Sequence, residues 1–206
     1  PVRVEIGSTI KPVESVALKI YEVAREQKFS LLVHLLATEA GTFLVFCRTK
    51  YGADKLAKKL AQGGFDAASI HGNKSQSQRT RALEGFKAGE HRILVATDIA
   101  ARGIHVDKIA HVINYDMPQA TEDFIHRVGR TGRVEESGTA TTFVMPEENR
   151  DIQIIERTLE RKIERLPLPT GLPVGPRSIH DEAADFQSRK AYHFRGARSF
   201  GRRRRY

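Results

Sequence analysis

The chain has 206 residues, of which 40% are hydrophobic, and this is enough to bury one sizeable core. No run approaches the roughly 18 apolar residues of a membrane span, and no signal peptide is visible, so we expect no membrane partner. The single cysteine, Cys47, excludes a disulfide within the chain and favours a reducing, cytoplasmic setting in which it is a buried, inert thiol. Because Pro1 is not a natural start, we expect the chain to be a piece of a longer protein.

The formal charge of +9 is concentrated at one end of the chain. Residues 187–206 contain eight basic side chains and no acidic ones, whereas the remaining residues carry 26 basic and 25 acidic side chains. The body is therefore close to neutral. A tail of this kind favours a polyanionic partner, with nucleic acid first and an acidic membrane surface second.

Hydrophobic periodicity predicts strands that alternate with helices along most of the chain. The expected strands are residues 2–6, 16–20, 42–47, 66–70, 92–96, 109–115 and 139–144. The expected helices are residues 26–38, 50–62, 76–88, 120–130 and 147–162. This alternation, with short connections, predicts an α/β fold whose mostly parallel sheet has helices on both faces.

Ligands of such sheets collect where the strands end. The polar residues directly after three of the expected strands are Arg48, Thr49 and Lys50, then His71 and Gly72, then Thr97 and Asp98. We therefore expect one edge of the sheet to gather the chemistry.

The stretch from His126 to Arg133 is the most unusual part of the chain, because three arginines recur at a spacing of three with glycines between them. Arginine carries a planar fork of donors that suits phosphate oxygens. If the stretch is helical, the three arginines lie near one face, and the glycines let a backbone or a phosphate approach closely. We interpret the stretch as arginines aimed at a multiply charged anion; the alternative is a solvated basic face on a surface helix.

Residues 167–176 are rich in proline and glycine and cannot form regular structure, so we expect a linker lying on a surface. The arginine, glycine and aromatic residues that follow combine groups for stacking with groups for phosphates. We therefore divide the chain into a domain of residues 1–166 and a linker with an extended basic tail, 167–206. The tail either binds RNA, mediates self-association with a neighbouring chain, or is a solubilising end.

Four segments in order resemble the motifs of one family. Residues 45–50 resemble motif IV; His71-Gly72 followed by residues 76–79 resembles the Gln-x-x-Arg motif; residues 96–103 resemble motif V; and residues 126–133 resemble motif VI. The chain is similar, over about residues 1–165, to the second, carboxyl-terminal RecA-like lobe of DEAD-box RNA helicases in superfamily 2. His126 favours this branch over the DEAH group, where motif VI usually begins with glutamine.

The resemblance implies roles for particular residues. Arg130 and Arg133 would be arginine fingers that meet the γ-phosphate of ATP, with His126 coupling the ATP site to the RNA site. RNA phosphates would be held by Gly72, Arg79 and Thr97, with further backbone contacts from Arg48 and Lys50. Asp98 would order the loops of motifs V and VI. For each of these residues the alternative is a structural contact at a strand end.

One position departs from the family pattern. The family usually has an aspartate two residues after Gly103, where it contacts the ribose of ATP, and this chain has His105. A neutral imidazole can still form a hydrogen bond with a hydroxyl, but the charge-assisted bond is lost.

The chain also lacks the parts that the family carries in its first lobe. It has no Gly-x-x-x-x-Gly-Lys-Ser/Thr loop to cradle phosphates and no Asp-Glu-Ala-Asp to hold Mg²⁺. Its histidines and cysteine show no metal-ligand spacing. We therefore expect half of an ATP-dependent RNA helicase, whose partners are RNA and a first lobe that holds ATP and Mg²⁺. The alternatives are a DNA-directed superfamily 2 motor and a non-catalytic RNA-binding or dimerisation module.

Overall fold

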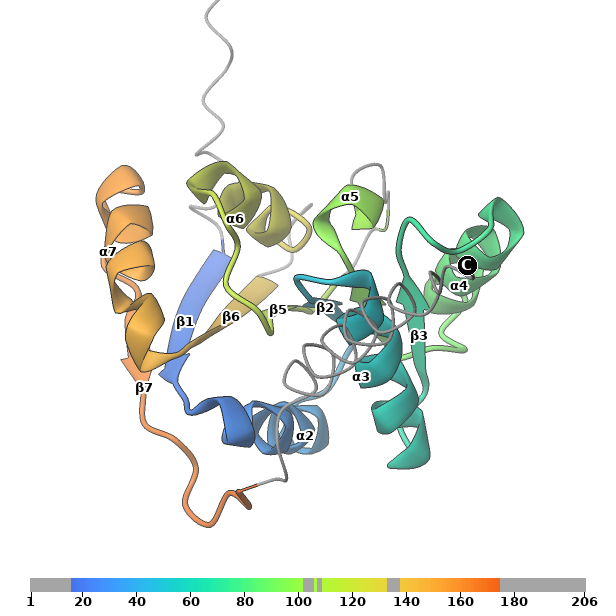
Figure 1. The fold of residues 1–206 in the computed structure, drawn as a ribbon, viewed down its shortest axis with the longest axis horizontal. Coiled ribbons are helices and arrows are strands. Elements are labelled where there is room, and N and C mark those ends of the chain that lie inside the picture. The colour runs from blue at the N-terminus through green and yellow to red at the C-terminus, as the bar shows by residue number, and fades with distance from the viewer. Residues whose placement is uncertain (1–15, 102–105, 107–108, 133–137, 175–206) are drawn as a thin grey trace, which may run out of the picture.

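The computed structural model describes residues 16–101, 106, 109–132 and 138–174, and in them seven parallel strands form one sheet (Figure 1). The strand order across the sheet is β3-β4-β2-β5-β6-β1-β7. The strands are β1 Val16–Glu22, β2 Phe43–Phe46, β3 Ala67–Ile70, β4 Ile93–Ala96, β5 His111–Asn114, β6 Gly138–Val144 and β7 Glu164–Leu166. Every pairing between them is parallel, as the alternation of strands and helices predicts.

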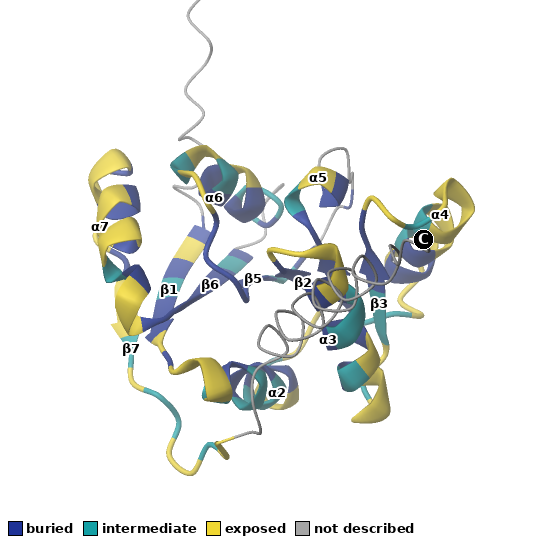
Figure 2. Ribbon diagram, in the orientation of Figure 1, coloured by how far each residue is buried: buried dark blue, intermediate teal, exposed yellow. Residues whose placement is uncertain are grey.

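Helices cover both faces of this sheet and bury its central strands completely. The α-helices are α2 Lys28–Thr38, α3 Lys50–Gln62, α4 Gln76–Lys87, α5 Asp98–Ala101, α6 Thr121–Val128 and α7 Asn149–Thr158; the 3₁₀ turns are η1 Arg25–Gln27 and η2 Pro146–Glu148. One hydrophobic core lies between the sheet and α2 and α3, and a second lies on the opposite face beneath α4 to α7. Figure 2 shows the buried strands between helices whose outer sides are exposed.

Local sequence signals explain where the two helices nearest the β3 edge begin. Thr49 is the N-cap of α3, and its side chain accepts a hydrogen bond from the backbone N–H of Gly52. Ser75 and Gln78 form a capping box at the start of α4. The predicted bounds of α3, residues 50–62, are confirmed.

At the amino-terminal edge of the sheet, the Arg92 side chain binds the carboxyl end of α2. Arg92 donates hydrogen bonds to the carbonyl oxygens of Leu36 (2.7 Å) and Gly41 (2.9 Å), and also to that of Glu39. These carbonyls lie at or beyond the last turn of α2, where helical partners run out. Arg92 therefore fixes the connection between α2 and β2.

Several predicted boundaries differ from the observed ones. The helix predicted at 120–130 ends at Val128, the helix predicted at 147–162 ends at Thr158, and the strand predicted at 109–115 covers only 111–114. The short helix α5 and the edge strand β7 have no counterpart among the predictions. β7 consists of Glu-Arg-Leu and is largely exposed, so its hydrophobic pattern is too weak to indicate a strand. The strand predicted at residues 2–6 and the tail from 175 onward lie outside the described residues.

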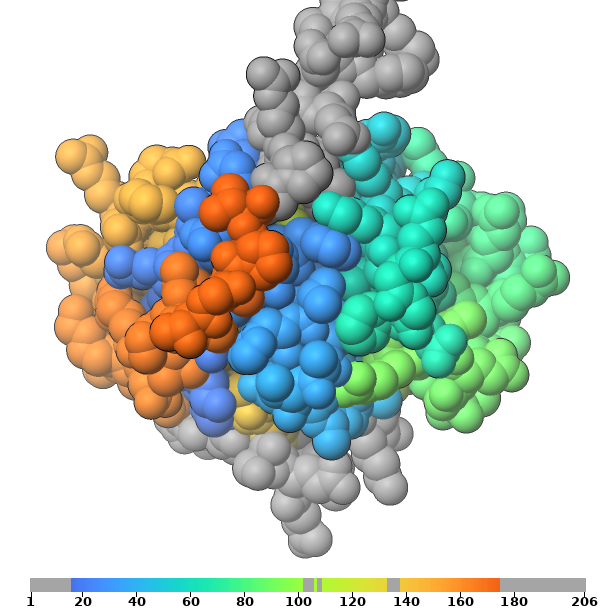
Figure 3. Space-filling view, turned by 90° about the horizontal axis from the view of Figure 1, so that it is seen from below, coloured from blue at the N-terminus to red at the C-terminus, as the bar shows by residue number. Residues whose placement is uncertain are grey.

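The segment that follows β7 lies along α2 (Figure 3). Leu168 and Leu172 pack against the core that α2 shares with α3, and the Ser30 hydroxyl donates a hydrogen bond to the Pro173 carbonyl (2.8 Å). The described part of the proline-rich segment thus rests on the domain surface, although hydrophobic packing continues beyond Leu166. The division of the chain at residue 166 remains a prediction.

Candidate functional site

The loops that follow β2, β3, β4 and β5 meet at the carboxyl-terminal edge of the sheet, which we call the carboxyl edge. Because all strands are parallel, the polar residues after each strand come to one side of the molecule, as the sequence predicts. They are Arg48 and Thr49 after β2, His71 and Gly72 after β3, Thr97 and Asp98 after β4, and Asp116 after β5.

Arg127 of α6 occupies the middle of this edge and is only 2% exposed. Its Nε lies 2.6 Å from Oδ1 of Asp98, and a terminal nitrogen lies 2.8 Å from Oδ2, so the pair is bidentate. The other terminal nitrogen donates to the Asn114 side chain (3.2 Å) and to the Asp116 carbonyl (2.7 Å), and the guanidinium lies over the Phe46 ring. One buried arginine therefore joins the ends of β2, β4 and β5 to α6.

The condition for a common helical face, that the arginine-rich stretch is helical, is not met between Arg127 and Arg130. Helix α6 ends at Val128, and Gly129 is its C-cap, so Arg130 lies beyond the helix rather than one turn along it. Arg127 is instead on the face of Phe124 and Val128, at the i+3 position from Phe124, and points into the protein with them. Its burial and its four hydrogen-bond partners occupy the guanidinium, so it is not available to an external anion.

Arg130 and His126 lie beside a recess at the surface. The recess has a volume of about 10 Å³, and Asp98 and Asp123 contribute to its wall. Arg130 is half-buried and His126 is exposed. A space of this size holds roughly one water molecule. The described residues thus present an arginine and a histidine at a surface that does not by itself enclose a nucleotide.

Two glycines in and after the arginine-rich stretch are required by the local backbone geometry. Gly132 has a φ of +69°, which disfavours a residue with a side chain. The neighbouring Thr131 hydroxyl donates a hydrogen bond to the Ile109 carbonyl, which fastens the stretch to the start of β5. A side chain at Gly138 would collide with Thr131 and with the Gly132 backbone, so the first residue of β6 has to be a glycine.

Lys50 and Gly72 come together from the loops after β2 and β3. The Lys50 ammonium donates to the Asn73 side chain (2.8 Å), and its Cε lies 3.7 Å from the point where a Cβ on residue 72 would be. Gly72 is exposed and leaves its backbone accessible beside this cation. A phosphate could therefore meet an ammonium group and a bare backbone at one place.

The loop after β3 is held by Asp54 of α3. Its carboxylate accepts a hydrogen bond from Ser69 (2.6 Å) and pairs with Lys74 (2.9 Å) and His71 Nε2 (2.8 Å). The Asn73 N–H donates to His71 Nδ1, so the neutral imidazole carries its proton on Nε2 and donates it to Asp54. Burial raises the pKa of Asp54, but the hydrogen bonds from Ser69, His71 and Lys74 outweigh burial and lower the pKa to about 2.

Thr97 and Arg79 flank the same loop but differ in exposure. Thr97 is buried, and its carbonyl accepts hydrogen bonds from the first turn of α5. Arg79 is half-buried on α4; one terminal nitrogen donates to Gln76 (3.3 Å), whereas its enclosed Nε has no hydrogen-bond partner among the residues that the structure describes. An enclosed donor of this kind is costly unless a ligand satisfies it.

Arg48 is engaged with the protein itself. Its guanidinium pairs with Glu148 (3.2 Å), and its backbone N–H donates to Asp116 (2.9 Å). Glu148 also accepts a hydrogen bond from the Met145 N–H (3.0 Å), so it connects the loops after β2 and β6. This geometry favours a structural contribution for Arg48.

Lys28 is a further buried charged residue at the carboxyl edge. It is 2% exposed, donates to the Tyr115 carbonyl (3.0 Å) and lies 3.8 Å from the Asp116 carboxylate. Cys47 is fully buried nearby, and burial raises the pKa of its thiol well above the usual value. The prediction of a buried thiol is confirmed.

Sequence reasoning aimed Arg127 at an external anion, and it overlooked the other residues that hold the edge together, Asn114, Asp116, Asp54, Lys28 and Glu148. Asp116 could have been found, because it follows a predicted strand just as Asp98 does. The pairing partners of Asp54 and Glu148 lie far away in sequence, and no local pattern indicates them. Arg133 and His105 lie outside the described residues, so their predicted roles stay predictions.

A layered α/β lobe whose strand ends carry paired charges and a glycine-spaced arginine segment is the architecture of a RecA-like motor lobe. Residues 27–135 match the family described as the helicase conserved C-terminal domain. The chain belongs to this family, and within it to the DEAD-box proteins of superfamily 2, as their carboxyl-terminal RecA-like lobe.

Individual relatives agree with this assignment. The chain is 43% identical over 171 residues to the DEAD-box ATP-dependent RNA helicase CshA of Geobacillus kaustophilus, a match that covers 82% of this chain and 37% of that protein. A crystal structure of a DEAD box protein from Methanococcus jannaschii has a TM-score of 0.70 at 40% identity, over 74% of this chain and 42% of that one. Dbp5 of S. cerevisiae, bound to RNA and ADP BeF3, has a TM-score of 0.73 at 26% identity, over 88% of this chain and 47% of that one.

The chain thus spans well under half the length of the first two relatives and just under half of the third. Among the helices of the described residues, none combines the length and the apolar composition that crossing a bilayer requires.

Proposed function

We propose that this chain is the second lobe of an ATP-dependent RNA helicase and that it works on ATP held by a first lobe. In this scheme Arg130, Arg133 and His126 face the nucleotide, and Gly72, Arg79, Thr97 and Lys50 face the RNA backbone. The Geobacillus relative is named as a helicase of this kind, and the Dbp5 structure contains RNA and a nucleotide analogue in a chain with a similar lobe.

The ion pair between buried Arg127 and half-buried Asp98 is the observation that supports the proposal most strongly. It fastens the start of α5, which follows β4, to α6, and Arg130 follows α6 after one intervening residue. Thr97, next to Asp98, donates its N–H to the Ile70 carbonyl at the end of β3, and the loop after β3 brings Gly72 beside Lys50 of α3. A movement of the nucleotide-facing arginine is therefore coupled through one ion pair to the strand end beside the RNA-facing loop.

The described residues fit one side of an ATP site. Arg130 and His126 border a recess too small for a nucleotide, and the sequence contains no phosphate-cradling loop. Arg130 would therefore stabilise negative charge on the terminal phosphate, while the first lobe would hold the rest of ATP and its Mg²⁺. His105 would be a further nucleotide contact through its imidazole.

RNA recognition in this scheme rests on the phosphate backbone. Lys50 supplies an ammonium beside the exposed Gly72 backbone, and Arg79 has a donor that no described group satisfies. Such contacts are largely independent of base sequence. They become part of a continuous groove when the two lobes close.

Arg130→Ala in the full-length protein tests the nucleotide assignment. We expect RNA-stimulated ATP turnover to fall on the order of 10³-fold, because the arginine acts on charge that develops at the γ-phosphate. RNA affinity without nucleotide should stay within about twofold of the parent value. The control is Arg150→Ala, which removes an exposed arginine on α7 that does not line the recess. Equal losses in both assays would instead assign Arg130 to RNA.

The isolated chain provides a second test. It should not hydrolyse ATP at a measurable rate, since the phosphate loop and the Mg²⁺ ligands are missing. RNA-stimulated turnover by a sample free of contaminating ATPases would contradict the proposal that this lobe completes a site built mainly by another.

A further inference from the structure

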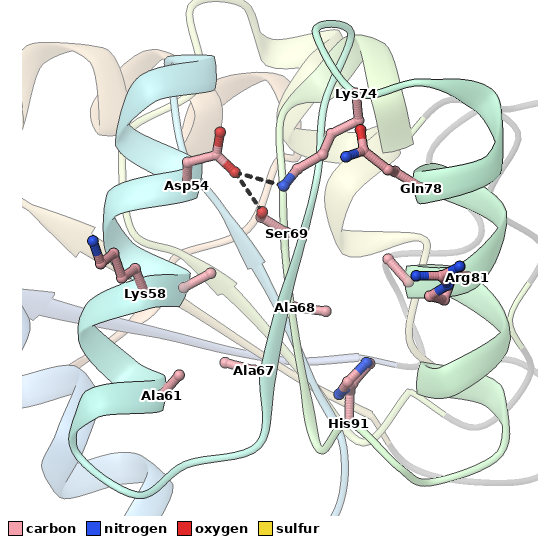
Figure 4. A pocket seen from close by; sticks show the side chains of 12 residues that line it. Asp54, Lys58, Ala61, Ala67, Ala68, Ser69, Lys74, Gln78, Arg81 and His91 are labelled. Carbon is pink, nitrogen blue, oxygen red and sulfur yellow. Dashed lines mark hydrogen bonds and ion pairs between the residues drawn. The ribbon is translucent and has the colours of Figure 1, made fainter.

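An open groove runs along the β3 edge of the sheet, on the flank of the molecule, and adjoins the site described above at Asp54, Ser69 and Lys74 (Figure 4). Its volume is about 490 Å³, and its walls are α3 on one side and α4 on the other, with β3 between them. Small side chains such as Ala57, Ala67 and Ala82 line it and keep it open. The groove is thus a space beside a strand that has a neighbour, β4, on one side only.

The backbone of β3 offers unpaired hydrogen-bonding groups to this groove. The carbonyls of Asp66 and Ile70 accept hydrogen bonds from the N–H groups of Ile93 (3.0 Å) and Thr97 (3.4 Å), so these alternate residues face β4. Ala67 and Ser69 lie between them, and their N–H and C=O groups therefore point away from the sheet. No described strand pairs with this outer side. An edge of this kind can accept a further strand.

The charges around the groove favour an acidic occupant. Lys58 and Arg81 belong to opposite walls, with the Lys58 ammonium turned outward, away from β3 (Figure 4). His91 lies at the end near the start of β4, and none of the three has an ion-pair partner among the described residues. Asp54 is the one acidic side chain in the lining, and Ser69, His71 and Lys74 already satisfy it. The free charge that the groove presents is therefore positive.

We propose that this groove is a docking site for an extended acidic segment of a partner protein, which pairs with β3 as an additional strand. β3 has four residues, so a segment of about four residues can pair with it, at roughly 3.3 Å per residue. Acidic side chains of the segment would reach Arg81 on one wall and, after a rotamer change of its flexible side chain, Lys58 on the other. Pairing through the backbone supplies affinity, and the cations select the charge of the segment.

Binding of a defined probe to the full chain tests the proposal. The probe is a fluorescent ten-residue peptide of alternating glutamate and valine, and its matched control alternates glutamate and proline, which keeps the charge but removes every second N–H donor. We expect the proline peptide to bind on the order of tenfold more weakly. Equal binding of the two peptides would contradict pairing with β3, and this comparison requires no change in the protein.

Charge reversal tests the groove itself. The double variant Lys58→Glu, Arg81→Glu should bind the glutamate-valine peptide on the order of tenfold more weakly than the parent chain. The double variant Arg150→Glu, Arg157→Glu is the matched control, because it makes the same change of four charge units at exposed sites on α7, and it should alter binding less than twofold. Equal weakening by the two double variants would show attraction to overall charge and overturn the docking site.

A competing occupant is single-stranded RNA, and the same variants exclude or establish it. A labelled decauridylate should lose no more than about twofold in affinity on the Lys58→Glu, Arg81→Glu change. If the double variant weakens decauridylate as much as it weakens the peptide, and decauridylate displaces the peptide, the groove is an RNA surface and the proposal is wrong.

Discussion

The middle of the carboxyl edge and the β3 flank both contain arginine and lysine, but the two regions place these charges differently. Arg127 and Lys28 in the middle are each 2% exposed and hold carboxylates and carbonyls of neighbouring loops. Lys58 and Arg81 on the flank line an open groove and have no ion-pair partner among the described residues. A buried charge that binds carboxylates and carbonyls fixes the backbone around it, whereas an exposed charge without an ion-pair partner remains available to a ligand.

This difference explains why a basic residue in this chain is not by itself a binding residue. Arg127 and Arg130 are three positions apart in the same motif, yet one is enclosed by Asp98 and Asn114 and the other borders a surface recess. The proposed assignment of functions follows from exposure: Arg127 positions the loops, and Arg130 meets the nucleotide.

The largest predicted effect is on stability when the ion pair at the centre is broken. Arg127→Leu leaves the half-buried Asp98 carboxylate and the Asn114 and Asp116 oxygens without their donor, so unfolding in urea should require about 1–3 kcal/mol less free energy. The control is Arg81→Leu, an exposed arginine on the flank, which should change the free energy of unfolding by less than about 0.5 kcal/mol. If both variants lose a similar free energy of unfolding, the central arginine is no more important for stability than the exposed arginine on the flank.

The second prediction adds the basic tail to the comparison. Residues 187–206 carry eight positive charges and no acidic ones, so deleting them should weaken RNA binding by the isolated chain on the order of tenfold or more. The slope of log affinity against log salt should also become shallower, by about 0.7 for each RNA phosphate that the tail neutralises. Affinity of both chains for one RNA across a salt series is the measurement. Unchanged affinity and slope would indicate that the tail serves a protein–protein contact.

The smallest predicted effect concerns Asp54, a paired acid that is close to half exposed. Its lowered pKa means that the folded state favours the carboxylate; this stability is present above the unfolded pKa near 4 and is lost as the pH falls through about 2. Asp54→Asn should therefore lower the free energy of unfolding at pH 7, and the difference from the parent should fade between pH 4 and pH 2. Because solvent screens the exposed pair, we expect less than about 1 kcal/mol.

Urea unfolding at several pH values measures this difference. A gap between Asp54→Asn and the parent that stays constant from pH 7 to pH 2 would contradict the assigned partners. If Asp54→Asn lowers the free energy of unfolding at pH 7 as much as Arg127→Leu does, the exposure of a charged side chain does not determine how much it contributes to stability.

The sheet was largely predictable because its strands are short, apolar and separated by clear turn signals. The run around Val45 and the run around Leu94 indicate buried strands, and the polar residues after them mark the carboxyl edge. β7 was not predictable, because Glu164 and Arg165 show no apolar alternation. Glu156 of α7 instead receives hydrogen bonds from the Arg165 guanidinium and the Ile163 N–H, which stabilise this edge strand from a distance along the chain.

The candidate site was predictable as a set of loops but not as a set of contacts. Lys50 and Gly72 were assigned to one edge from strand ends alone, and the structure brings them together. The helical spacing of the arginines was misleading, because Gly129 ends α6 before Arg130. Long-range pairs such as Arg48 with Glu148 join residues 100 positions apart and leave no mark on the local pattern.

RNA affinity of the full-length protein, measured with and without a non-hydrolysable ATP analogue, tests most directly whether this lobe couples the two ligands. We predict that the analogue tightens RNA binding by the parent protein and that Arg130→Ala loses most of this tightening while its nucleotide-free RNA affinity is unchanged. Arg150→Ala should retain it. An Arg130→Ala protein that still tightens fully with the analogue, or that binds RNA weakly without nucleotide, would contradict the assignment of Arg130 to the ATP side of the site.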